Sequence, residues 1–129
     1  MLDHTGIVVT DLVKARAFYD ALAKPLGLGT ADNFKGSFVL GKGANQYPYL
    51  WIGTLIPSYW IEGSRPGVNQ MHVAFSAASK EAVDAFYKAA LAAGGKDNGK
   101  PGPREGVDKY YGAFVLDPDG NNIEACFRG

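Results

Sequence analysis

The sequence predicts an α+β domain built from two repeated units, each with one strand, one helix and further strands. The first observation is a repeat in which a histidine, a Phe-Tyr pair and a glycine recur at a constant offset. The matched residues are His4, Phe18, Tyr19 and Gly27 in the first half and His72, Phe86, Tyr87 and Gly95 in the second. The second observation is that the chain holds only two histidines, and both occupy this repeated position. Both halves are therefore expected to contribute to one site.

Composition favours one compact domain that recognises a small molecule. The 129 residues are 47% hydrophobic, which suits a single core rather than two. Thirteen basic residues balance thirteen acidic ones, so neither a nucleic acid nor an anionic membrane is an expected partner. The one cysteine excludes an internal disulfide, no signal-peptide pattern precedes the first strand, and a cytoplasmic location is expected. We expect the first half at 1–61, a Gly/Pro-rich linker at 62–69 and the second half at 70–129.

Each predicted element of the first unit follows from local spacing. A β-branched run predicts a strand over 4–9, and Asp11 is placed to cap a helix whose apolar residues recur at helical spacing. Pro25 and Gly27 end this helix, and strands are expected over 37–40 and 49–56, with room for another short strand.

The second unit repeats this order of elements. A strand is expected over 71–76, and Ser79 is placed to cap a helix that ends at Gly94-Gly95. The Gly/Pro-rich segment 96–108 is expected to be a loop. Strands are then expected over 110–116 and 121–127, joined by the Asp117-Pro-Asp-Gly turn.

Strand alternation places three ionisable residues on one face of the sheet. His4 and His72 alternate with bulky apolar neighbours that should pack on the helices, so both histidines face away from the helices. Glu124 lies between Ile123 and Ala125 and is expected on the same face as the histidines. Two imidazoles and a carboxylate suit a divalent metal such as Zn, Ni, Mn, Fe or Co, with open positions for water or substrate. The alternative is that the histidines are satisfied by ordinary hydrogen bonds.

The motifs together resemble a known superfamily. His-Thr-Gly-Ile-Val-Val-Thr-Asp-Leu at 4–12, His-Val-Ala-Phe at 72–75 and Asp-Pro-Asp-Gly-Asn at 117–121, followed by Ile123-Glu124, carry the resemblance. They resemble the vicinal oxygen chelate superfamily, which includes glyoxalase I, bleomycin-resistance proteins, fosfomycin-resistance thiol transferases and extradiol dioxygenases. The resemblance implies two tandem βαβββ units that form a cupped mixed sheet with helices on the outer face.

The resemblance also implies functional residues. His4, His72 and Glu124 would be the metal ligands, and Glu124 would also handle protons. Glyoxalase I-like members have a fourth ligand, Glu or Gln, on the first-half strand equivalent to that of Glu124. No acidic residue lies between Phe34 and Ile61, and Gln46 is the one substitute. A glyoxalase I-like lyase or isomerase, or a fosfomycin-type thiol transferase, is implied. The alternatives are a bleomycin-resistance-like binder without catalysis and a member that has lost its activity.

Aromatic and basic residues near the expected cleft are candidates for binding substrate. Cys126 shares the strand face of Glu124 and is interpreted as an inert thiol. Because a cupped sheet leaves open edges and aromatic surface, we also expect a homodimer. The candidate substrate-binding residues are Tyr49, Trp51, Arg104, Tyr110 and Tyr111.

Overall fold

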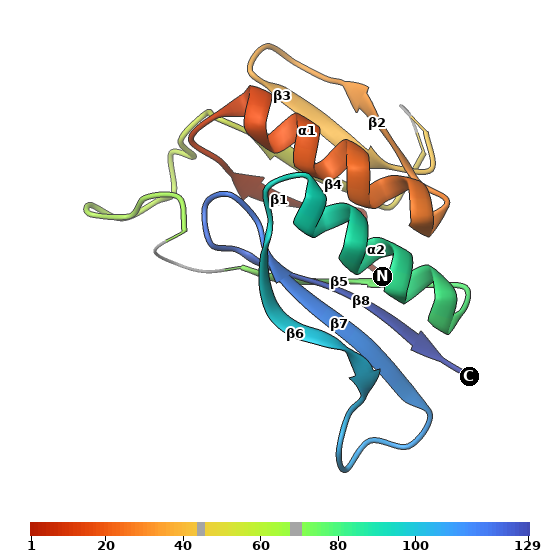
Figure 1. The fold of residues 1–129 in the computed structure, drawn as a ribbon. Helices are drawn as coiled ribbons and strands as arrows, with labels where there is room; N and C mark the ends of the chain where they lie inside the picture. The colour runs from red at the N-terminus through yellow and green to blue at the C-terminus, as the bar shows by residue number, and fades with distance from the viewer. Residues whose placement is uncertain (44–45, 68–70) are drawn as a thin grey trace.

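The computed structural model describes residues 1–43, 46–67 and 71–129, and it contains two βαβββ units in tandem (Figure 1). The first unit consists of β1 (His4–Val8), α1 (Leu12–Ala23), the short 3-10 helix η1 (Lys24–Leu26), β2 (Gly29–Asp32), β3 (Ser37–Gly41) and β4 (Tyr49–Gly53). The second consists of β5 (His72–Ser76), α2 (Lys80–Ala92), β6 (Lys96–Pro103), β7 (Tyr110–Leu116) and β8 (Asn122–Arg128). The predicted fold class and the internal duplication are confirmed.

Both units have the same sheet topology. The strand orders are β1-β4-β3-β2 and β5-β8-β7-β6, with β1 parallel to β4 and β5 parallel to β8. The remaining neighbours are antiparallel, so each sheet is mixed. β1 and β5 are edge strands, and their residues line a common cavity, so these two edges face each other.

The helices form where the capping signals predict them. The Asp11 side chain accepts a hydrogen bond from the Lys14 amide, and the Ser79 side chain accepts one from the Ala82 amide. The two helices lie side by side in Figure 1 and pack against each other and against the sheets. One continuous core results, with Phe18, Leu22 and Phe86 fully buried in it. The opposite face of each sheet is therefore left for the candidate site.

The segment Lys96–Pro103 is a strand, and the expectation of a loop over 96–108 was wrong for this part. β6 pairs with β7, although the register shifts between Asp97 and Gly99 and again between Gly99 and Gly102. An edge strand with such irregularities tolerates Gly and Pro because it need not donate every hydrogen bond. The Gly and Pro residues that predict a loop thus mark a bulged edge strand.

The Asp-Pro-Asp-Gly-Asn turn joins the two units. Tyr19 in α1 donates its hydroxyl to Asp117 at 2.7 Å, and both side chains are buried. Asp117 also accepts hydrogen bonds from the Asp119 amide and from the amide and side chain of Asn121. Asp119 in turn accepts from the hydroxyl of Thr10 at 2.7 Å. The motif is therefore a structural joint between units that are far apart in sequence.

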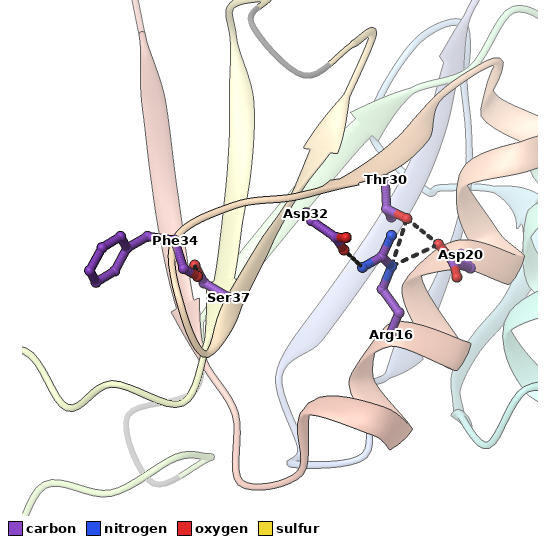
Figure 2. A network of polar contacts seen from close by, with 6 residues as sticks. All are labelled: Arg16, Asp20, Thr30, Asp32, Phe34 and Ser37. Carbon is purple, nitrogen blue, oxygen red and sulfur yellow. Dashed lines mark hydrogen bonds and ion pairs between the residues drawn. The ribbon is translucent and has the colours of Figure 1, made fainter.

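A second polar cluster, on the first unit, fixes edge strand β2 to α1 (Figure 2). The Arg16 guanidinium bonds to Asp32 at 2.7 Å and to the Thr30 hydroxyl at 2.9 Å, and Thr30 also contacts Asp20. Arg16 lies over the Phe38 ring as well, at 5.0 Å from the ring centre. The acidic neighbours raise the pKa of Arg16, chiefly through the hydrogen bond to Asp32.

None of the described helices is long and apolar enough to span a bilayer.

Candidate functional site

His72 and Glu124 form a close pair on the face of the second sheet that points away from the helices. His72 opens β5, and Glu124 lies in β8 opposite Ala74. His72 Nε2 lies 3.2 Å from Glu124 Oε2, with the His72 side chain 53% exposed and the Glu124 side chain 3% exposed. The other carboxylate oxygen, Oε1, is buried and has no hydrogen-bond partner in the part of the chain that the structure describes. A buried oxygen without a donor is costly, so the carboxylate has capacity for a further ligand.

Glu124 is surrounded by an aromatic wall and three basic groups. Burial raises the pKa of Glu124, while His72, Arg104 and Arg128 act against this rise. Gly112 leaves room for the carboxylate, because a Cβ at this position would lie 3.0 Å from Glu124 Oε1. The carboxyl group is thus desolvated, so it takes up a proton more readily than an exposed glutamate does.

A chain of two asparagines orients the His72 ring. Asn122 Nδ2 lies 2.9 Å from His72 Nδ1, and Asn98 Nδ2 donates to Asn122 Oδ1 at 3.0 Å. Phe114 stacks beside the His72 ring with 6.1 Å between the ring centres. Asn122 was not singled out from the sequence. Its position two residues before Glu124, on the same strand face, was the signal available.

His4 is oriented by a carboxylate and an aromatic ring. Its Nδ1 lies 2.6 Å from Asp3 Oδ1, and its ring stacks on Tyr49 at 5.0 Å with 6° between the planes. A Nδ1–H that donates to a carboxylate leaves the Nε2 lone pair available, as in metal-binding histidines. Asp3 thus contacts His4 as a carboxylate contacts a metal-binding histidine, on the ring nitrogen that does not bind the metal.

Within the described ranges of one chain, no three His, Cys, Asp or Glu side chains are grouped so that they could hold one metal ion. The cavity that contains His4 is lined by Val73, Ala74, Phe75 and Ser76 of β5, and His72 is not among its lining residues. A single chain therefore brings His72 and Glu124 together and leaves His4 apart from them.

The register of the two sheets identifies the first-unit equivalent of Glu124. Glu124 pairs with Ala74 in β5, and the repeat places Gly6 in β1 at the position of Ala74. Gly6 pairs with Trp51. An indole therefore occupies the position of the acidic ligand, and Gln46 lies outside β4.

The other candidate substrate-binding residues lie on different faces. Tyr110 is beside Glu124, since its ring and Glu124 Oε1 both approach Gly112. Arg104 lies over the Phe114 ring at 4.8 Å, and its buried Nε has no partner among the described residues. Tyr111 points to the helix side instead, where its hydroxyl donates to Asp84 in α2 at 2.8 Å. The structure thus groups Arg104 and Tyr110 with Glu124, and it separates Tyr111 from them.

Cys126 and Arg128 extend the Glu124 face along β8. Burial and the Glu124 carboxylate raise the pKa of the Cys126 thiol. This agrees with the interpretation of Cys126 as an inert thiol, because a raised pKa disfavours the reactive thiolate. Arg128 lies over the Tyr110 ring at 4.5 Å and was not singled out from the sequence.

Comparisons with known proteins agree with this architecture. Residues 1–125 match the Glyoxalase/Bleomycin resistance protein/Dioxygenase superfamily. The chain is similar to a glyoxalase/bleomycin resistance protein from Albidiferax ferrireducens T118, with 34% identity, a TM-score of 0.80 and coverage of 100% of this chain and 99% of that one. It is also similar to a putative glyoxalase from Bacillus halodurans, with 25% identity, a TM-score of 0.73 and coverage of 98% and 95%.

A third similar structure supports the fold alone. It is a glyoxalase/bleomycin resistance protein/dioxygenase family enzyme from Burkholderia phytofirmans PsJN, with 20% identity, a TM-score of 0.70 and 98% coverage of both chains. A search among curated proteins gives no match. The match over residues 1–125, the duplicated βαβββ topology and the 34% identity over the full length agree. The chain therefore belongs to the Glyoxalase/Bleomycin resistance protein/Dioxygenase superfamily.

Proposed function

We propose that the protein is a divalent-metal-dependent enzyme that acts on a small oxygenated substrate. Two copies of the chain assemble its metal site, with His72 and Glu124 from one copy and His4 from the other. The observation that carries this proposal is the buried Glu124 carboxylate, which has one oxygen 3.2 Å from His72 Nε2 and the other without a partner.

The spacing of the two donor atoms supports a shared ion. Metal–ligand bonds of about 2.0–2.2 Å place adjacent donor atoms about 3.0–3.4 Å apart in octahedral or tetrahedral geometry. The 3.2 Å between His72 Nε2 and Glu124 Oε2 lies in this range. If the Asn122 and Asn98 amides both turn over, Asn122 Oδ1 accepts the Nδ1 proton of His72, Asn98 Oδ1 accepts from Asn122 Nδ2, and the His72 Nε2 lone pair is free for a metal.

A second copy would supply the missing imidazole. His4 has a carboxylate on Nδ1 and, among the described residues of its own chain, forms no three-residue ligand group with His72 and Glu124. The segment between β4 and β5 exposes large apolar side chains, a pattern typical of an interface between subunits. These side chains are Leu55, Ile56, Tyr59 and Ile61. A homodimer would cover them and bring the first unit of one copy to the second unit of the other.

The residues around Glu124 suit proton transfer on an oxygenated substrate. A bound divalent ion would polarise adjacent substrate oxygens and stabilise developing negative charge. Glu124, whose pKa is raised by burial, would accept or return the proton at its unpartnered Oε1. Arg104 has a buried Nε without a partner among the described residues and would bind a substrate oxyanion. Tyr110 would line the site. Lyase, isomerase and thiol-transferase reactions all use these roles.

A second candidate function is binding of a small molecule without catalysis, as in a bleomycin-resistance-like protein. Trp51 favours it, because an indole stands where a fourth, acidic ligand would complete the site. This candidate requires no metal, so metal content separates the two.

Mixing two inactive variants tests the shared site. Purified His4→Ala and His72→Ala proteins should each bind little Mn²⁺ or Zn²⁺, and the wild type should bind about one ion per chain. If the site spans two copies, a mixed dimer of the two variants retains one intact site. Unfolding and refolding the variants together should then restore metal binding, measured by elemental analysis, and light scattering should report twice 13.8 kDa.

Three results would contradict the proposal. A wild-type protein that takes up no stoichiometric metal after reconstitution favours the binding function. Full metal binding by the His4→Ala protein alone shows that His4 is not a ligand. Restored folding without restored metal binding in the mixture, with the wild type loaded, assigns the site to a single chain.

A further inference from the structure

A separate cavity lies on the first unit, and it is lined by both tryptophans of the chain. Its volume is about 250 Å³, and its walls include Gly6, Trp51, Pro57, Trp60 and Arg65. The sequence contains only these two tryptophans, 51 and 60, and neither is a metal ligand in the proposal above. The cavity borders the same sheet face as His4 but contains none of the proposed ligands. The cavity is therefore distinct from the proposed metal site.

The backbone beneath Trp51 is shaped to hold an indole flat. A Cβ at Gly53 would lie 2.4 Å from the Trp51 ring, and a Cβ at Gly6 would lie 3.3 Å from it. By the repeat and the strand registers, the second-unit equivalents of these glycines are Ala74 and Cys126. The first unit thus combines a tryptophan with two glycines where the second combines a glutamate with two larger residues. The Trp51 ring thus lies close against the backbone of two glycines and also lines the cavity.

Arg65 adds a single positive charge to these aromatic walls. The side chain is exposed where it lines the cavity, and among residues 1–43, 46–67 and 71–129 it has no ion-pair or hydrogen-bond partner. No acidic residue lines the cavity with it. A guanidinium beside aromatic rings can bind a carboxylate through two parallel, charge-assisted hydrogen bonds.

We infer that this cavity binds a small molecule with a planar aromatic ring and a carboxylate, the ring stacking on Trp51 and the carboxylate pairing with Arg65. A cavity of about 150 Å³ is enough to hold benzene, so 250 Å³ admits one ring or two fused rings. The inference rests on the proposed function only in calling this ligand a substrate, because binding here requires no metal.

The test uses 2-naphthoate as the probe and metal-free protein in EDTA. The two indole N–H signals in a ¹H–¹⁵N NMR spectrum report on the cavity alone, since both tryptophans line it. Both signals should shift in a saturable way as 2-naphthoate is added. The neutral 2-naphthamide has the same rings and should bind at least about tenfold more weakly. A Trp51→Phe variant assigns the two signals.

Matched variants locate the carboxylate. Arg65→Gln should weaken 2-naphthoate binding about tenfold without changing 2-naphthamide binding. Lys88→Gln, which removes an exposed cation on α2, should change neither. Equal binding of acid and amide, shifts at neither indole, or a loss in Arg104→Gln rather than Arg65→Gln would overturn the inference. Because EDTA removes metal, failure of the metal proposal leaves this result unaffected.

Discussion

The two units share a backbone but differ in chemistry at equivalent positions. In the second unit His72 is held by Asn122, and Glu124 lies beside it as a buried anion. In the first unit His4 stacks on Tyr49, and Trp51 occupies the position of Glu124. The duplicated units thus share the histidine but differ at the position of Trp51 and Glu124. The second unit has a carboxylate there and the first unit an aromatic ring.

The joint between the units is where a substitution should have the largest effect on folding. Asp117→Ala removes the acceptor of four hydrogen bonds, including that of the buried Tyr19 hydroxyl. We expect the free energy of unfolding to fall by about 3–5 kcal/mol, because buried donors lose their charged partner. Urea denaturation measures this change. Asp119→Ala, which loses the exposed contact to Thr10, serves as the control and should cost about 1 kcal/mol. Equal losses would show that the buried hydrogen bond from Tyr19 to Asp117 stabilises the joint no more than the exposed contact between Thr10 and Asp119.

Glu124→Gln should separate metal binding from folding in the second unit. The substitution preserves volume and strand pairing but removes the anionic ligand, so metal affinity should fall by about 100-fold or more. The melting temperature of the metal-free protein should change little, because the buried charge is itself costly. Cys126→Ser on the same strand face should leave metal affinity unchanged. If the Gln variant keeps full affinity and its metal-free form loses stability, Glu124 is a structural partner of the surrounding basic groups.

Local sequence signals predicted most of the fold. Asp11 and Ser79 cap the helices where expected, and alternation correctly places Glu124 opposite the helix side. These features depend on residues a few positions apart. Tyr110 and Tyr111 illustrate the limit, because two adjacent aromatic residues suit either face, and only tertiary packing on α2 assigns Tyr111 to the helix side.

The arrangement of the site depended on information that the sequence does not carry. The equivalence of Trp51 and Glu124 was hidden because the connections before β4 and β8 differ in length, and strand register resolves it. The separation of His4 from His72 depends on how the edges of β1 and β5 face each other. The loop expected over 96–108 overlooked β6, since Gly and Pro mark both loops and irregular edge strands.

Trp51→Glu should make the first unit resemble the second. The new carboxylate would lie beside His4 as Glu124 lies beside His72, because both pairs occupy the same register positions. Gly6 and Gly53 leave ample space for it. We expect metal affinity to rise about tenfold, since an added anionic ligand strengthens a divalent site. Isothermal titration with Mn²⁺ measures the change, and Trp51→Leu controls for loss of the indole. An unchanged affinity would show that the first unit is not part of the metal site.

The smallest expected effect concerns the pH dependence of the joint. Burial, together with the negative charge of Asp117, raises the pKa of Tyr19 well above its ordinary value of 10.0. Above pH 10 the unfolded chain therefore releases the Tyr19 proton while the folded chain keeps it, so the free energy of unfolding falls as pH rises. Tyr19→Phe removes this titration together with one hydrogen bond. At neutral pH the variant should be about 1–2 kcal/mol less stable than the wild type. The difference should shrink as pH rises above 10, as measured by urea denaturation at each pH. A difference that stays constant would mean that Tyr19 ionises equally in both states and that its hydroxyl is not held by Asp117.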